Sequence, residues 1–265
     1  MTPALKSRRG WIAGFCLAWM ASPGYPANAT DNTLPPELGE RDRRMIENAL
    51  GQTVLGRAIS APALADPVGF FAPVPGPRIY RLLNGERHGL DEPHRFITQE
   101  GQGGGRVWEY RIADGEALLF AEQADGSIVL TGVNDFKEGV SIHYNPPKPF
   151  LTQGMAAGDE RKFTVQAQIF KLKEPGHLVH SGRLDGISVS LGTYQITVPA
   201  GQFDAMLIKS TTHGSIGPAK IDNTQYHFFA LHAGIVASLE QREVNALGVY
   251  HATVKAPRVL IAKPE

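Results

Sequence analysis

Near position 200 the sequence is Leu191-Gly-Thr-Tyr-Gln-Ile-Thr-Val-Pro-Ala-Gly-Gln-Phe-Asp-Ala-Met-Leu-Ile-Lys209, and this stretch predicts a β-hairpin. Pro199 presets the backbone at the first central position of a type I turn, and Gly201 can adopt the left-handed conformation that closes the turn with a bulge. The first arm alternates between an apolar and a polar face, formed by Tyr194, Ile196 and Val198 and by Gln195 and Thr197. Most of the remaining chain repeats this unit of two short strands and a tight turn.

An alternation of period two runs from Arg78 to the end of the chain and is interrupted by turn signals such as Asn84-Gly85, Asp114-Gly115 and Asp125-Gly126. We count roughly twelve strands, connected in series as an antiparallel meander. No motif repeats with a period of about 20 to 50 residues, which disfavours a propeller or a solenoid. The predicted fold class is therefore all-β: a large antiparallel meander, strongly curled as a sheet or closed as a barrel, with one N-terminal amphipathic helix.

The amphipathic helix is predicted over 40–59, because Ile46, Leu50 and Val54 recur at helical spacing. Gly51 weakens this helix, so packing of its apolar stripe must stabilise it. We expect the helix to dock against the sheet or to plug an open end of it. A helix that binds the membrane surface or a partner is the alternative.

The predicted domain organisation follows from these patterns. It consists of a signal peptide over 1–29, a segment over 30–77 with a leader, the helix and a proline-rich connector, and an antiparallel β domain over 78–265. The prolines of the connector, 61–77, exclude a helix and a central strand. The stretch Tyr144-Asn-Pro-Pro-Lys-Pro-Phe150 interrupts the strands and is the candidate boundary between two possible halves, 78–145 and 151–265.

The first 29 residues have the three parts of a secretory signal peptide. A basic segment, an apolar run and an A-x-A cleavage site follow one another, at Lys6, Arg8 and Arg9, at 11–20 and at Ala27-Asn28-Ala29. The apolar run is about half as long as a membrane span requires. Cleavage would remove Cys16, the single cysteine, and this excludes thiol catalysis, disulfides and cysteine–metal sites in the mature chain. We therefore expect a periplasmic or secreted bacterial protein with no membrane span after signal cleavage.

Charge gives little indication of a polyanionic partner. The signal peptide carries three positive charges and no negative ones, so its removal changes the net charge from +0 to about −3. Such a mild balance offers no basic stripe for nucleic acid and no polybasic patch for anionic lipid. We therefore expect no nucleic-acid partner.

No motif assigns a catalytic or metal-binding residue. His177 and His180, like His227 and His232, are spaced so that their rings point to opposite faces of a strand, and only a turn at Pro175-Gly176 would keep a metal site open at the first pair. Two glycine-containing stretches fail as a phosphate loop and as a nucleophile elbow, namely Gly101-Gln-Gly-Gly-Gly105 and His213-Gly-Ser-Ile-Gly217. We expect no cofactor and no metal, and only a triad or carboxylate pair dispersed along the chain stays open.

Three predicted strands carry apolar side chains on both faces, at 117–120, 205–208 and 228–231. Such strands are covered on both sides, or line an interior on one side and meet the helix on the other. Ordinary core is one interpretation. An apolar ligand cavity is the other, because barrels of this strand number can enclose unfilled space. The sequence identifies no binding residues for such a cavity.

The hairpin phrase Thr197-Val-Pro-Ala-Gly-Gln-Phe-Asp-Ala205 resembles the V-P-A-G-T-F-D-A hairpin of a broad group of exported bacterial β-rich proteins of unknown function, with Gln202 where threonine is usual. Phe228-Phe-Ala-Leu-His-Ala-Gly-Ile-Val236 is similar to a second phrase of this group and departs from it at His232 and Ala233. Phe71-Ala-Pro-Val-Pro-Gly76 is similar to its opening phrase. The layout is also loosely similar to the half-open barrels that carry lipoproteins across the periplasm. The group has no agreed activity, so the resemblance implies an exported β protein and assigns no site residue.

Three functional hypotheses follow. The first is an exported, soluble, non-enzymatic β protein that binds an apolar or amphiphilic component of the cell envelope, such as a lipid. The second is an envelope assembly factor or accessory subunit that acts on another envelope protein through its outer surface. The third is a hydrolase with a dispersed active site.

Overall fold

The computed structural model describes residues 37–85, 87–101, 105–246 and 250–264, so the predicted signal peptide lies outside the described residues. The helices and strands are α1 Glu40–Leu50, β1 Leu55–Ile59, α2 Pro67–Phe71, β2 Pro77–Leu82, β3 Asp91–Glu100, β4 Arg106–Ile112, β5 Glu116–Glu122, β6 Ile128–Asp135, β7 Val140–Leu151, β8 Glu160–Lys171, β9 Glu174–Val198, β10 Gly201–Ile216, β11 Ala219–Ala230, β12 Gly234–Ala246, β13 Tyr250–Lys255 and β14 Arg258–Ala262. Within these ranges, neither helix has the length and apolar character needed to cross a membrane.

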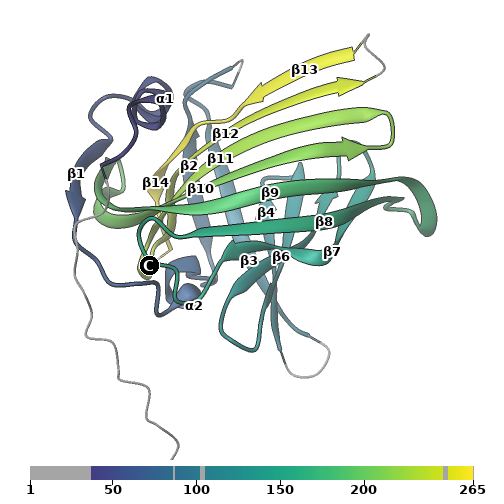
Figure 1. The fold of residues 1–265 in the computed structure, drawn as a ribbon, viewed down its shortest axis with the longest axis horizontal. Coiled ribbons are helices and arrows are strands. Elements are labelled where there is room, and N and C mark those ends of the chain that lie inside the picture. Colours follow the sequence, from purple (N-terminus) through teal and green to yellow (C-terminus); the bar gives the residue numbers. More distant parts are fainter. Residues whose placement is uncertain (1–36, 86, 102–104, 247–249, 265) are drawn as a thin grey trace, which may run out of the picture. The chain divides into compact units, whose positions relative to one another are not determined.

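Twelve antiparallel strands form a closed barrel (Figure 1). Strands β2 to β12 pair in chain order, β14 joins β12 to β2, and the pairing of β8 with β9 belongs to this meander. Two short strands are added outside the closed path: β1 pairs with β9, and β13 pairs with β12. The predicted fold class, an antiparallel meander closed as a barrel, is confirmed.

The predicted hairpin connects β9 to β10. Val198 is paired with Gly201, so Pro199 and Ala200 are the two loop residues, and Gly201 has a φ of +132°. The three predicted apolar positions of the first arm, Tyr194, Ile196 and Val198, are all buried. This confirms the face assignment that the alternation predicted.

The helix predicted over 40–59 is wrong at its C-terminal end, because α1 ends at Leu50. Gly51 has a φ of +105°, a conformation that favours glycine, and its N–H donates a hydrogen bond to the carbonyl of Glu47 (2.9 Å). The chain then forms β1, which pairs with β9. Val54 is buried next to this strand instead of continuing the helical stripe. Strand pairing therefore outweighs the helical periodicity after Gly51.

The proline-rich connector contains a helix that the sequence analysis excluded. α2 begins at Pro67, a position where a helix does not need the missing N–H. The side chain of Asp66 accepts a hydrogen bond from the N–H of Gly69 (2.8 Å) and caps the helix. Ala72 ends it in a left-handed conformation. Proline here marks the start of a helix.

The candidate boundary at 144–150 is part of a continuous strand, β7, and the described part of 78–265 forms one sheet. Pairing of β7 with β8 ends at Asn145, whereas Lys148 and Pro149 stay opposite β6. Prolines lack the N–H that a second neighbouring strand would need, which explains why β7 loses one partner here. The prolines therefore mark a one-sided stretch of strand inside a single domain.

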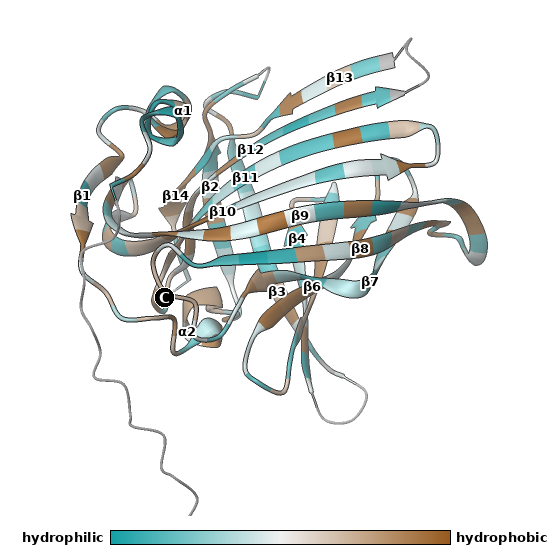
Figure 2. Ribbon diagram, viewed as in Figure 1, coloured by the Kyte–Doolittle hydropathy of each residue, from teal (hydrophilic) through white to brown (hydrophobic). Residues whose placement is uncertain are grey.

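At β9–β12 other parts of the chain cover both faces of the sheet. The sequence analysis gave this as one of two interpretations of the strands that carry apolar side chains on both faces. On the outer face, Ile46 of α1 belongs to a buried cluster with Leu207 and Phe228. On the inner face, Phe71 of α2 belongs to a second cluster that includes Ile208 and Phe229. Figure 2 shows hydrophobic colour around α2 and where β1 meets β9, and hydrophilic colour along much of α1.

Candidate functional site

One end of the barrel interior is closed by α2 and a group of aromatic side chains. The ring centre of Phe71 lies 4.8 Å from those of Phe96 and Phe120 and 5.4 Å from that of Trp108. These rings meet edge to face, the arrangement that their quadrupoles favour. The closed end is therefore a packed apolar floor.

A buried arginine secures this floor. Arg78 is only 1% exposed, and its guanidinium donates hydrogen bonds to the carbonyls of Ala72, at the end of α2, and Ala233, in the turn before β12. The N–H of His232, in the same turn, donates to the carbonyl of Gly69 (2.8 Å). The β11–β12 turn thus holds α2 at the end of the barrel.

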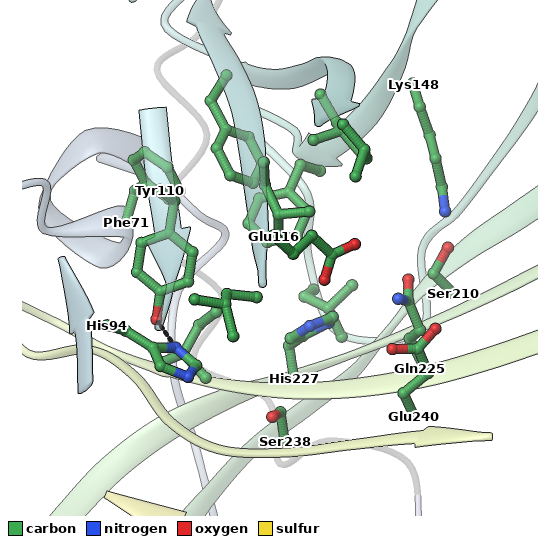
Figure 3. A pocket seen from close by; sticks show the side chains of 18 of the residues that line it. Phe71, His94, Tyr110, Glu116, Lys148, Ser210, Gln225, His227, Ser238 and Glu240 are labelled. Carbon is green, nitrogen blue, oxygen red and sulfur yellow. Dashed lines mark hydrogen bonds between the residues drawn. The ribbon is translucent and has the colours of Figure 1, made fainter. Parts of the chain in front are cut away.

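A cavity of about 140 Å³ lies next to the floor (Figure 3). A cavity of about 150 Å³ is large enough for one benzene ring. Along four of the strands its lining changes from apolar near the floor to polar further away: Phe120, Leu118 and Glu116 on β5, Phe150 and Lys148 on β7, Ile208 and Ser210 on β10, and Ile235, Ser238, Glu240 and Arg242 on β12. β11 contributes the polar residues His227, Gln225 and Asn223, and β6 contributes the apolar residues Leu130 and Val133. The interior is therefore amphipathic along its length.

A second hollow of about 470 Å³ lies next to the polar end of the cavity. Six residues line both spaces: Ile112, Glu116, Val133, Tyr144, Arg242 and Arg258. The hollow is also lined by turn residues, including Asp114 after β4 and Lys137 after β6. The two spaces are therefore neighbours, and the second lies at the end of the strands opposite to α2.

Lys148 projects into the polar part of the cavity from β7 (Figure 3). Its ammonium lies 5.6 Å from the centre of the Phe163 ring. Burial lowers the pKa of Lys148 to about 8, and the negative charge of Glu240 opposes this effect only in part. Lys148 is therefore mostly protonated at pH 7 in a place that disfavours its charge.

His227 faces the same space from β11. Its ring packs 5.4 Å from the ring of Phe150 and 5.7 Å from that of Phe229. Burial, together with the positive charges of Lys148 and Arg258, lowers the pKa of His227 to about 3. His227 is therefore neutral at neutral pH and does not balance charge in the cavity.

Two carboxylates, Glu116 and Glu240, lie at the polar end of the cavity. Burial and the nearby charge of Glu240 raise the pKa of Glu116. Glu240 accepts a hydrogen bond from Nδ2 of Asn223 (3.2 Å) and lies 3.8 Å from Nε of Arg242. Glu240 is thus already shared between two partners.

A hydrogen-bonded network forms the neighbouring wall. His94 Nε2 lies 2.9 Å from Glu92, and its Nδ1 lies 2.8 Å from the hydroxyl of Tyr110 (Figure 3). Because a carboxylate only accepts, Nε2 donates to Glu92 and Nδ1 of the neutral ring accepts from Tyr110. Burial raises the pKa of Glu92, but the hydrogen bond from His94 and the charges of Arg258 and Arg87 outweigh it and lower this pKa to about 2. The charge of this wall is therefore compensated.

The structure brings one of the four histidines considered in the sequence to the cavity, His227. His177 lies on β9, where its Nδ1 is 3.5 Å from a carboxylate oxygen of Glu174, and it does not line the cavity. His180, on the same strand, packs near Gly217. The glycines at 101 and 105 join β3 to β4, and 213–216 end β10. In the part of the chain that the structure describes, no group of three or more His, Cys, Asp or Glu side chains is placed to hold a metal.

The sequence analysis missed the polar residues of the cavity, above all Lys148. One signal was available: on β11 the polar residues Asn223, Gln225 and His227 alternate with Tyr226 and Phe228. In a strand with one solvent face, such a polar row would point outward. Here the apolar row meets α1 outside the barrel, so the polar row points inward.

Three solved structures are similar to this chain. A candidate exported protein with a YmcC-like fold from Bacteroides fragilis shares 16% identity at a TM-score of 0.40, covering 75% of this chain and 98% of that one. The hypothetical lipoprotein YmcC from Escherichia coli shares 12% sequence identity at a TM-score of 0.35, and the match covers 86% of this chain and 100% of that one. A candidate lipoprotein from Parabacteroides distasonis shares 14% sequence identity at a TM-score of 0.35, and the match covers 72% of this chain and 96% of that one. No protein-family model and no curated protein matches the chain.

Proposed function

We propose that this protein is an exported, non-enzymatic barrel that binds a small amphiphilic molecule in its interior. The observation that carries this proposal is the gradient of the cavity lining. An apolar group would lie on the aromatic floor around Phe71 and Phe120, and a polar group would lie beside Lys148 and Asn223. Ligand sites generally combine an apolar wall with a few convergent polar groups in this way.

The size of the cavity narrows the class of ligand. About 140 Å³ accommodates one ring or a short acyl segment, and a full lipid chain would have to extend beyond the cavity, towards the second hollow. The envelope component proposed from the sequence is therefore a small amphiphile, or the end of a larger one. Export to the periplasm or the medium rests on the signal-peptide pattern of 1–29.

A cavity-filling variant tests binding inside the barrel. Ser188 and Ser181 both lie on β9, but Ser188 is buried and lines the cavity, whereas Ser181 is exposed. Native mass spectrometry and solvent extraction of the purified wild type should reveal a bound small amphiphile. Ser188→Phe should lose it and Ser181→Phe should retain it. Equal retention in both variants, or no ligand in the wild type from its native host, would contradict the proposal.

A hydrolase is the second candidate, because Ser210 and Lys148 line one cavity and lysine can serve as the base for a serine nucleophile. Among the described residues, Oγ of Ser210 has no hydrogen-bond partner, so the two side chains are not joined as a catalytic pair in this structure. Turnover of p-nitrophenyl butyrate that disappears in Ser210→Ala and in Lys148→Met would favour this candidate. Equal background rates in all three proteins would count against it.

A further inference from the structure

The polar part of the cavity contains a cation without an anionic partner. Among the residues that the structure describes, no side chain forms an ion pair or a hydrogen bond with Lys148. Glu240 is the acid that acts on it, and this carboxylate is engaged by Asn223 and Arg242. Lys148 is half-buried, and a desolvated positive charge without a bound counter-charge is costly, so this site favours an anion.

The other cations near the cavity lie beside carboxylates or backbone carbonyls, although Nε of Arg258 and Nη1 of Arg78 form no hydrogen bond among the described residues. Arg258 lies 3.2 Å from Glu92, and Arg242 lies 3.8 Å from Glu240. Arg78 is bonded to two backbone carbonyls. Among the described lysine and arginine residues that line this cavity, Lys148 is thus the one that forms no ion pair.

Two oxygens beside the cavity also lack partners. Oγ of Ser210 and Oδ1 of Asn223 are buried, and neither forms a hydrogen bond within the described part of the chain. Of the two, only the hydroxyl of Ser210 can donate to an anion, because an amide oxygen only accepts. Figure 3 shows Ser210 and Lys148 pointing into the same part of the cavity. A hydroxyl and an ammonium together can donate to the two oxygens of one carboxylate.

We propose that Lys148 binds the carboxylate of a small monocarboxylic acid whose apolar body lies on the aromatic floor. This inference rests on the proposed function and names the ligand class. A dianion such as a phosphate monoester fits less well, because Glu116 and Glu240 line the same cavity and one ammonium compensates one charge. The apolar body is limited to about one ring or a short acyl chain.

Proton uptake distinguishes Lys148 from an arginine anchor. The titratable groups whose charge is coupled to that of Lys148 are Glu240 on β12 and His227 on β11, and His227 is neutral. Glu116, Arg242 and Arg258 line the same space. The pKa of Lys148 is about 8 in the empty protein, and a bound carboxylate raises it. Binding above pH 8 must therefore take up a proton, and affinity should fall by up to about tenfold per pH unit there. An arginine anchor would show neither effect, because arginine stays protonated.

The test is isothermal titration with benzoate, benzamide and benzyl alcohol as probes. Benzoate should bind the wild type most tightly of the three probes. Lys148→Met should lower the affinity for benzoate by about 10- to 100-fold and change the affinity for benzamide little. Lys162→Met removes the same charge from an exposed position on β8 and should leave all three affinities unchanged. Titrations at pH 8.5 in buffers of different ionisation enthalpy should report proton uptake by the wild type, a measurement that needs no variant.

The outcomes separate this inference from the proposed function. Equal affinity for the three probes, or benzoate binding that survives Lys148→Met without proton uptake, would overturn the carboxylate assignment. The proposed function would still hold if Ser188→Phe abolished that binding. Absence of benzoate binding to the wild type overturns the assignment as well, and then the extraction experiment alone decides whether the barrel holds a ligand.

Discussion

The two faces of strands β10–β12 contrast within one sheet. The outer face, under α1, is a filled core in which Leu207 and Phe228 have no exposed surface. The inner face of the same strands packs against α2 through Ile208 and Phe229 at one end, and further along it lines the cavity with Ser210, His227 and Glu240. Neighbouring residues along a strand therefore differ in role. Outward-facing side chains stabilise the fold by packing, whereas the inward-facing side chains beyond α2 are less tightly packed and place polar groups around the cavity.

Truncation of the two faces should sharpen this contrast. Phe228→Ala removes a fully buried ring under α1 and should lower the free energy of unfolding by about 3–5 kcal/mol without changing ligand affinity. Phe120→Ala, on the floor, should destabilise comparably and also weaken binding of an aromatic probe. Chemical denaturation and titration of both variants check this. An affinity loss in Phe228→Ala as large as that in Phe120→Ala would break the distinction between the faces.

Acid should reveal the inner face through His227. Its pKa is about 3 in the folded protein, below the value of about 6.5 in an unfolded chain, so the unfolded state takes up the proton first. Stability contributed above pH 6.5 is therefore lost as the pH falls from about 6.5 to about 3, by up to about 4 kcal/mol. In His227→Gln this part of the acid dependence should disappear. The exposed His177 provides the control, and an equal flattening in His177→Gln would contradict the assignment.

Two lysines should respond with opposite signs. Lys148→Met, inside the barrel, should raise the free energy of unfolding at pH 7 by about 1–3 kcal/mol, because the folded state disfavours its charge. That gain should shrink as the pH rises from about 8 to about 10.5, where the unfolded lysine also loses its proton. Lys209→Met, outside, breaks an ion pair with Asp42 of α1 (2.7 Å) and should lower stability by about 1–2 kcal/mol. Denaturation at pH 7 and pH 9.5 measures both, and a loss of stability in both variants at pH 7 would refute the contrast.

The outer face could be predicted from the sequence, and the inner face could not, for a physical reason. Tyr194, Ile196 and Val198 alternate with polar residues, so their burial follows from local pattern alone. Lys148 belongs to the cavity because closure of the sheet into a barrel places β7 around the same interior as β10 and β11, which lie far away in the sequence. No local spacing records such a juxtaposition. A lysine among prolines predicts a loop. The pairing of β7 with β6 makes this stretch a strand instead, and that pairing is a tertiary interaction that the local sequence does not indicate.

Element ends show the same limit on a smaller scale. The stripe of Ile46, Leu50 and Val54 satisfies a helix, and the sequence contains no stronger stop than a glycine. The interaction that competes with helix formation is the pairing of β1 with β9, and β9 is in place only when the sheet has formed. Pro67 was misassigned for the related reason that a proline excludes helix interior but favours the first helical position.

Gly51 offers the most local test of this competition. If α1 continued through position 51, Gly51→Ala would stabilise the helix by up to about 1 kcal/mol. In the structure the φ of Gly51 is +105° and the space around an added Cβ is open, with Val54 4.0 Å away, so the substitution introduces backbone strain and no clash. We therefore expect Gly51→Ala to lower the free energy of unfolding by about 1–2 kcal/mol. Gly176→Ala, at an open position without a positive φ, should stay within about 0.5 kcal/mol of the wild type. Because the two alternatives differ in sign, one pair of denaturation curves decides whether the sheet or the helical stripe governs the chain after Leu50.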